Sequence, residues 1–249
     1  MQNIYGLIGK TLSHSFSKRY FTEKFEKESI TNSIYELFEI PNIEEFPKLI
    51  SQYPNLRGLN VTIPYKEAVI PFLDGLDERA KRIGAVNVIQ FSKSTLIGFN
   101  SDYIGFKASL EKFIPHTRLK ALILGTGGAS KAVKTALEDL QIPYLYVSRQ
   151  KSDGVLSYED LDKEIIKDYL LIINTTPLGM YPKTDTFPAI PYEWINSNHY
   201  LYDLVYNPEK TLFLQKGEEK GAKILGGLQM LYLQAEGAWR IWQETIKNV

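Results

Sequence analysis

Residues 58–66, GLNVTIPYK, place three polar side chains at the end of an apolar segment that is typical of a β-strand. Alternate side chains of an extended chain share a face, so Asn60 and Thr62 are expected on one side. Val61, Ile63 and Tyr65 are expected on the other, apolar side. The proline that follows has no N–H to donate, so strand pairing should end there, just before Lys66. An amide, a hydroxyl and an ammonium together suit a polar ligand and proton transfer. The alternative is a half-exposed strand with a solvated face.

A glycine-rich turn, GTGGAS at residues 125–130, lies between an apolar strand pattern and a helix pattern. Glycines in this context permit a tight turn and close approach of the backbone to a pyrophosphate, which then binds at the helix N-terminus. Ser130 replaces the last glycine of the usual fingerprint, so the match is partial. The sequence predicts a dinucleotide site that includes Gly125, Thr126, Gly127, Gly128 and Ala129.

The strand after this turn ends in YVSRQK, which bears on the choice of cofactor. An NAD-binding unit normally carries an acidic residue there for the ribose 2′-hydroxyl. This chain has Ser148, Arg149 and Lys151 instead. A guanidinium pairs with a 2′-phosphate through charge-assisted hydrogen bonds, so we expect NADP(H), with Ser148 and Arg149 in the site. The alternative is that Arg149 is an ordinary surface charge.

Further polar residues cluster at predicted helix starts and strand ends. In SHSFS, residues 13–17, one serine is expected to cap the first helix, which leaves the others, including Ser15 or Ser17, free to bind a ligand. GAVNV places Asn87 at a strand edge, and GFNSDYIG places Asp102 where a helix begins. The alternative for Asp102 is a helix cap.

Together these stretches resemble the shikimate dehydrogenase family. Seven motifs of the family pattern occur in order between residues 14 and 235. The family motifs are HSxSP, NVTxPxK, GAVNT, GxNTDxxG, GxGGA, NTTPxGM and a late GxxML–Q segment. This chain has, in the same order, HSFSK, NVTIPYK, GAVNV, GFNSDYIG, GTGGAS, NTTPLGM and GGLQMLYLQA. The departures are Lys18 for a proline, Val88 and Ser101 for threonines, and SRQ for NRT. They concern substrate preference and the adenine side, and leave the catalytic positions unchanged.

The resemblance implies an oxidoreductase that reduces 3-dehydroshikimate to shikimate with NADPH, reversibly, on the route to chorismate and the aromatic amino acids. It makes Lys66 and Asp102 the catalytic pair. It assigns substrate binding to Ser15, Ser17, Asn60, Thr62, Asn87, Tyr206 and Gln234. It also places Leu204, Gly227 and Met230 near the nicotinamide.

Two alternative functions remain open. One is a quinate/shikimate dehydrogenase with relaxed use of NAD and NADP, and the other is a binding or regulatory homologue without turnover. Retention of Lys66 and Asp102 argues against the second, because a pure binding protein has little need of a proton donor.

Strand and helix patterns alternate along the whole chain, which predicts an α/β fold with mainly parallel sheets. The first part shows strands at 3–9, 33–40 and 56–63, helices at 17–28, 41–51 and 77–85, and a hairpin of 85–91 and 95–100 around a three-residue turn. The second part shows a helix at 102–113, a strand, glycine turn and helix within 120–140, and strands at 144–149, 169–174, 199–205 and 222–226.

The last predicted helix, residues 226–247, has an apolar stripe that needs a partner: Leu228, Leu231, Ala235, Trp239, Trp242 and Ile246. We expect it to pack back onto the first part. The predicted domains are therefore an α/β substrate domain of residues 1–101 and 227–249, completed by the C-terminal helix, and a Rossmann-type NADP-binding domain of residues 102–226. Gly227, Met230 and Gln234 would share one face of this helix.

Composition excludes several function classes. The 249 residues contain no cysteine, which excludes disulfides, thiol catalysis and thiolate metal sites, and the three scattered histidines, His14, His116 and His199, do not suggest a metal centre. Lys plus Arg equals Asp plus Glu, at 29 each, so neither nucleic acid nor a membrane is an expected partner. With no signal-peptide pattern and no bilayer-length apolar run, we expect a cytoplasmic enzyme, monomeric or homodimeric.

Overall fold

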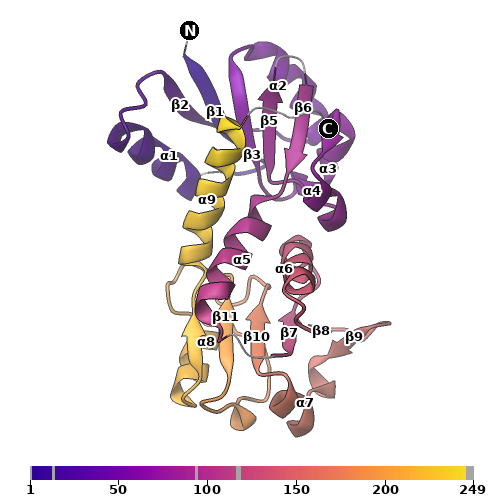
Figure 1. Cartoon of the computed structure of the whole chain (residues 1–249). Coiled ribbons are helices and arrows are strands. Elements are labelled where there is room, and N and C mark those ends of the chain that lie inside the picture. Colours follow the sequence, from indigo (N-terminus) through magenta and orange to yellow (C-terminus); the bar gives the residue numbers. More distant parts are fainter. Residues whose placement is uncertain (1, 13–14, 93–94, 116–118, 245–249) are drawn as a thin grey trace. The chain divides into compact units, whose positions relative to one another are not determined.

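The computed structural model describes residues 2–12, 15–92, 95–115 and 119–244 (Figure 1). The chain forms two compact units: a first unit of residues 1–101 and 235–249, and a second unit of residues 102–234. Each unit contains a six-stranded sheet. The α/β class predicted from the alternating patterns is confirmed. In the described part of the chain, no helix has both the length and the hydrophobicity required to span a bilayer.

The sheet of the first unit has the strand order β2-β1-β3-β5-β6-β4. Its strands are β1 (Asn3–Gly9), β2 (Ser33–Glu39), β3 (Leu56–Val61), β4 (Gly75–Leu76), β5 (Val88–Ser92) and β6 (Thr95–Phe99). β1 is parallel to β2 and β3, whereas β5 is antiparallel to β3 and β6. Because Ser92 pairs with Thr95, the predicted three-residue hairpin turn is wrong, and only positions 93 and 94, outside the described residues, connect the strands.

Helices cover both faces of this sheet. On one face, α1 (Phe16–Lys27) and the C-terminal part of α9 (Leu228–Gln243) enclose an aromatic cluster, in which the Trp242 ring centroid is 5.0 Å from Tyr5 and 5.3 Å from Phe21. The opposite face is covered by α2 (Phe46–Gln52), α3 (Tyr65–Ala68) and α4 (Glu78–Ile83), with the short helices η1 (Ile43–Glu45) and η2 (Ile70–Phe72).

The sheet of the second unit is entirely parallel and has the order β12-β11-β10-β7-β8-β9. Its strands are β7 (Ala121–Leu124), β8 (Tyr144–Ser148), β9 (Val155–Ser157), β10 (Leu171–Asn174), β11 (Tyr200–Asp203) and β12 (Lys223–Leu225). Counted within the unit, this is the 3-2-1-4-5-6 order of a Rossmann fold. Ligands of such sheets bind beyond the carboxyl ends of the strands where the order reverses, here between β7 and β10.

Helices also cover both faces of the second sheet. α7 (Lys163–Asp168) and α8 (Leu212–Glu219) pack on one face, with η3 (Tyr158–Asp160) and η4 (Tyr192–Trp194) nearby. On the other face, α5 (Ser101–Phe113) places Phe106 against Tyr202, with ring centroids 5.2 Å apart. The remaining helix, α6 (Gly128–Asp139), follows β7 directly.

The helix α9 belongs to both units. Its first turns pack against α5, where a Cβ on Gly105 would lie 2.6 Å from the Met230 carbonyl oxygen. Its later turns carry Trp242 into the first unit. The compact units therefore divide inside α9, between Gln234 and Ala235, and not at the predicted position 227. Ile246 of the predicted stripe lies outside the described residues.

Candidate active site

The end of β3 forms the centre of the candidate site in the first unit. β3 stops at Val61, and the Thr62 N–H donates to the Ile8 carbonyl oxygen at 3.0 Å. The chain then turns, with the Tyr65 N–H donating to the Thr62 carbonyl oxygen at 2.9 Å, so that Lys66 is the second residue of α3. Ile63 is 77% exposed, so its predicted place on the apolar side is wrong, because the strand ends before it.

The side chain of Asn60 is held by two hydrogen bonds inside the first unit. Its Nδ2 donates to the Asn87 carbonyl oxygen at 3.2 Å, and its Oδ1 accepts from the Tyr35 hydroxyl at 2.7 Å. Asn60 is 7% exposed, and a buried amide with both ends engaged has one orientation. Tyr35 was not predicted to belong to the site.

Asn87 connects β5 to the start of α5. Its Oδ1 accepts from the Ser101 backbone N–H at 2.6 Å, and its Nδ2 donates to Ser101 Oγ at 3.1 Å. Ser101, which replaces a threonine of the family pattern, therefore still supplies the hydroxyl. α5 begins at Ser101, so Asp102 is its second residue and not the residue that precedes the helix.

The two described serines of the first loop have different partners. Ser15 is the N-cap of α1 and accepts from the Lys18 backbone N–H at 3.4 Å, as predicted for one serine of this segment. Burial raises the pKa of the Tyr35 hydroxyl, and the nearby Ser17 opposes that shift. Lys18 forms an ion pair with Glu36 at 2.8 Å. Positions 13 and 14, including His14, lie outside the described residues.

In the second unit, the glycine turn after β7 has the geometry of a phosphate-binding loop. Gly125 has φ +102°, and a Cβ there would lie 2.9 Å from Thr176 Cγ2. At Gly127 and Gly128, by contrast, a Cβ would meet no heavy atom of the described chain within 4 Å. This open space adjoins the N-terminus of α6, whose first turn carries no acidic residue. The loop therefore fits a pyrophosphate.

Ser130 occupies the position of the missing glycine without leaving a polar group unpaired. It is 1% exposed, and its hydroxyl donates to the Gly127 carbonyl oxygen at 2.7 Å. The exposed Thr126 and the half-buried Ala129 complete the turn.

Arg149, which the sequence predicts to bind the 2′-phosphate, follows the end of β8. β8 ends at Ser148, and Arg149 is exposed, with no carboxylate partner among the residues that the structure describes. Lys151 instead pairs with Asp160 at 2.8 Å. Burial raises the pKa of Tyr158, and the nearby positive charge of Arg149 opposes that shift. Within the described chain, Arg149 is therefore the cation at this strand end that has no internal counter-charge.

A buried carboxylate network at the ends of β10 and β11 was missed by the sequence reasoning. Asp203 is fully buried and accepts from Asn174 Nδ2 at 2.9 Å, from the Val205 N–H at 3.0 Å and from Thr211 Oγ1 at 2.5 Å. Burial raises the pKa of Asp203 to about 6, and these three donors act in the opposite direction. The network fixes the segment that contains Leu204.

Leu204 and Gly227, both predicted near the nicotinamide, are brought together. The Gly227 N–H donates to the Val205 carbonyl oxygen at 3.0 Å, and a Cβ on Gly227 would lie 2.2 Å from the Leu204 carbonyl oxygen. Met230 is buried, Gln234 Nε2 donates to the Leu231 carbonyl oxygen at 3.1 Å, and Tyr206, after β11, is 38% exposed. Gly105, the final residue of GFNSDYIG, is a further residue that the sequence reasoning missed.

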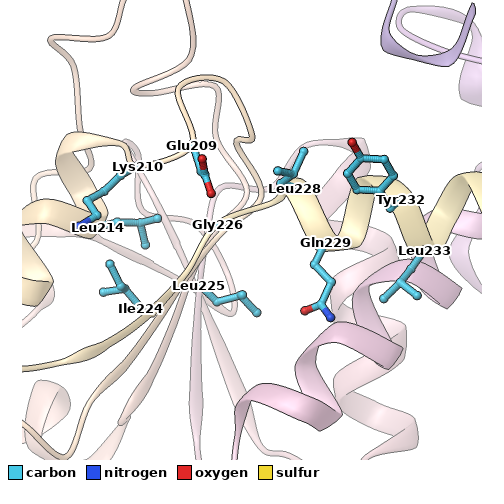
Figure 2. A pocket seen from close by; sticks show the side chains of 10 residues that line it. All are labelled: Glu209, Lys210, Leu214, Ile224, Leu225, Gly226, Leu228, Gln229, Tyr232 and Leu233. Carbon is cyan, nitrogen blue, oxygen red and sulfur yellow. The ribbon is translucent and has the colours of Figure 1, made fainter. Parts of the chain in front are cut away.

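Two hollows have linings of their own. One, of 680 Å³, is in the second unit beside β12, α8 and the start of α9 (Figure 2). The other, of 440 Å³, is in the first unit between α1 and β2. None of the predicted site residues lines either hollow. Over the described residues, no group of three or more His, Asp or Glu side chains is arranged to hold a metal.

Comparison with known proteins identifies the family. Residues 7–89 match the family model of the shikimate dehydrogenase substrate binding domain. A protein named shikimate dehydrogenase (NADP(+)) from Clostridium beijerinckii is 41% identical to the chain, over 96% of this chain and 92% of its own length. A protein of the same name from Carboxydothermus hydrogenoformans is 39% identical, over 95% of this chain and 90% of its own length. The crystal structure of shikimate 5-dehydrogenase from Thermus thermophilus in complex with NADP(H) and shikimate is similar to this structure. The TM-score is 0.86, at 29% identity, and the match covers 99% of this chain and 95% of that one. This chain belongs to the shikimate dehydrogenase family.

Proposed function

We propose that this chain catalyses the reversible, NADPH-dependent reduction of 3-dehydroshikimate to shikimate. The observation that carries the proposal is its 41% identity, over 96% of its length, to a protein named shikimate dehydrogenase (NADP(+)). The first unit would bind the substrate and the second unit NADP(H). We expect the enzyme to work in the cytoplasm, as a monomer or homodimer.

The residues of the second unit fit NADP(H). The backbone of residues 125–129 would hold the pyrophosphate in the open space at the N-terminus of α6. Ser148 and Arg149 would hold the 2′-phosphate, and Leu204, Gly227 and Met230 would line the nicotinamide site. When bound, this cofactor supplies the hydride.

Lys66 and Asp102 would perform the proton chemistry. Hydride addition to the ring ketone creates negative charge on its oxygen. The Lys66 ammonium would stabilise that charge and donate the proton that completes the alcohol. The Asp102 carboxylate would orient the ammonium and favour its charged form.

The remaining polar residues would bind the hydroxyl and carboxylate groups of the substrate with short donors and acceptors. They are Ser15, Ser17, Asn60, Thr62, Asn87, Tyr206 and Gln234. Because Asn60 and Asn87 already use their side-chain oxygens inside the protein, they would offer N–H groups to substrate oxygens.

The direct test follows NADPH absorbance with 3-dehydroshikimate, and the reverse reaction with shikimate and with quinate. Lys66→Ala should lower kcat by roughly 10²–10⁴-fold while NADPH still binds. Asp102→Asn should lower kcat more than it changes KM. A Lys66→Ala variant with near wild-type turnover refutes the catalytic assignment. Efficient quinate oxidation with NAD points to the broader dehydrogenase, and ligand binding without any turnover points to a non-catalytic homologue.

A further inference from the structure

Tyr35 lies in the interior of the first unit, and its sequence context is typical of an ordinary core residue. It is on β2, is 3% exposed, and its ring stacks on Phe21 with centroids 4.6 Å apart and planes 12° from parallel. On another side, the Trp242 ring of α9 lies 6.4 Å away. The aromatic ring is therefore held in one position by α1 and α9.

The hydroxyl of Tyr35 connects β2 to the end of β3. It donates to Asn60 Oδ1 at 2.7 Å. Burial raises the pKa of this hydroxyl, and the nearby Ser17 of α1 opposes that shift. Asn60 and Ser17 both belong to the proposed substrate site.

The direction of these hydrogen bonds follows from Asn87. Its carbonyl oxygen can only accept, so Nδ2 of the Asn60 amide must face it, and Oδ1 must face Tyr35. Tyr35 must therefore donate its proton to Asn60. The second N–H of the Asn60 amide has no acceptor among the described residues, so it is available to donate to an oxygen of a ligand.

We propose that Tyr35 is a positioning residue of the substrate site: it fixes the Asn60 amide so that this side chain donates to a carboxylate or hydroxyl oxygen of the ligand. This inference rests on the proposed function. Without the Tyr35 hydroxyl, Asn60 Oδ1 is left buried with no partner, and the amide gains other orientations.

The test is Tyr35→Phe, which keeps the stacked ring and removes only the hydroxyl. This variant should raise KM for shikimate about tenfold, because it loses the hydrogen bond to the buried Asn60 oxygen. KM for NADP+ should stay unchanged, and the dissociation constant for shikimate measured by calorimetry should rise with its KM. The matched control is Tyr5→Phe, because Tyr5 is buried in the same aromatic cluster, and its hydroxyl accepts only a 3.4 Å hydrogen bond from Gln243 among the described residues.

A double-mutant cycle separates positioning from general destabilisation. In an Asn60→Ala background, Tyr35→Phe should raise KM for shikimate much less than in the wild type, because the group that it orients has been removed. An unchanged shikimate KM in Tyr35→Phe, or an equal rise in Tyr5→Phe, overturns the positioning role while the activity stands. A wild-type chain that neither binds nor oxidises shikimate refutes the proposed function and this inference with it.

Discussion

Asn60, Asn87 and Asp203 use most of their hydrogen-bonding capacity inside the protein. The two amides direct their oxygens to Tyr35 and to the start of α5, and the carboxylate receives three donors. Such residues fix loops and leave few orientations for the groups that remain. In the first unit, the amide groups left for a ligand are N–H donors, which suits a ligand rich in oxygen acceptors.

The raised pKa of Asp203 predicts a pH dependence of stability. Its folded-state pKa of about 6 lies above the ordinary value of 3.8, so between these values the folded chain binds more protons than the unfolded chain. Stability from this group therefore falls as pH rises through this window and is level above it. The free energy of unfolding of the wild type, minus that of Asp203→Asn, should fall over the same window in urea titrations. A difference that is constant with pH would contradict the shift.

Arg149 should set the preference between cofactors. Arg149→Ala is expected to weaken NADPH binding by about 1.5–3 kcal/mol and to leave NADH binding nearly unchanged, because only NADPH carries the 2′-phosphate. Steady-state kinetics with both cofactors measures this. The matched control is Lys151→Ala, since Lys151 is already paired with Asp160 and should matter much less.

Two outcomes would contradict that assignment. Equal losses with NADPH and NADH would indicate that Arg149 stacks on the adenine. A wild-type preference for NADH would instead indicate that Asp153, four residues further on, contacts the ribose hydroxyls.

At the scale of elements, periodicity predicted the long strands and helices and missed the short ones. β1 has the predicted bounds, and both sheets have the expected main strands. β4 and β9 are two and three residues long, too short for a hydrophobic pattern. Tyr35 and Gly105 were missed for another reason: one is an aromatic residue in a strand and the other a helical glycine, and their roles depend on partners distant in sequence.

The anchoring of α9 gives a prediction at this scale. Trp242 is buried, its Nε1 donates to the Ile89 carbonyl oxygen at 3.1 Å, and a Cβ on Gly58 would touch its ring at 2.3 Å. Trp242→Ala should therefore destabilise the first unit by about 3–5 kcal/mol in denaturant titrations. Gln229→Ala, at an exposed position of the same helix, should change stability by less than about 0.5 kcal/mol. Similar values for both variants would show that α9 does not anchor the first unit.

At the scale of the whole molecule, most of the proposed substrate residues belong to the first unit and the proposed cofactor residues to the second, whereas Asp102, Tyr206 and Gln234 of the substrate site belong to the second unit. Residues 102–234 form a unit with the strand order of a Rossmann fold. Residues 1–101 contain the polar end of β3 and form the first unit together with the later turns of α9. A ligand that binds only the folded state stabilises the part that it contacts, by about 2.7 kcal/mol at a hundred times its dissociation constant. Each ligand should therefore protect most strongly the unit that holds most of its proposed contacts.

Hydrogen exchange with each ligand alone tests this division, with α9 as an internal reporter. NADP+ should slow amide exchange in residues 125–130 and in the first turn of α9, around Met230, because those amides adjoin the proposed cofactor residues. Shikimate should slow exchange in residues 56–66 and in α9 from Gln234 onward, because Gln234 is a proposed substrate residue and the later turns belong to the first unit. Arg149→Ala is the control, since it should weaken the NADP+ effect and leave the shikimate effect intact. Protection of the whole of α9 by either ligand alone would mean that the two units respond as one, and protection of residues 56–66 by NADP+ alone would reverse the assignment of the units.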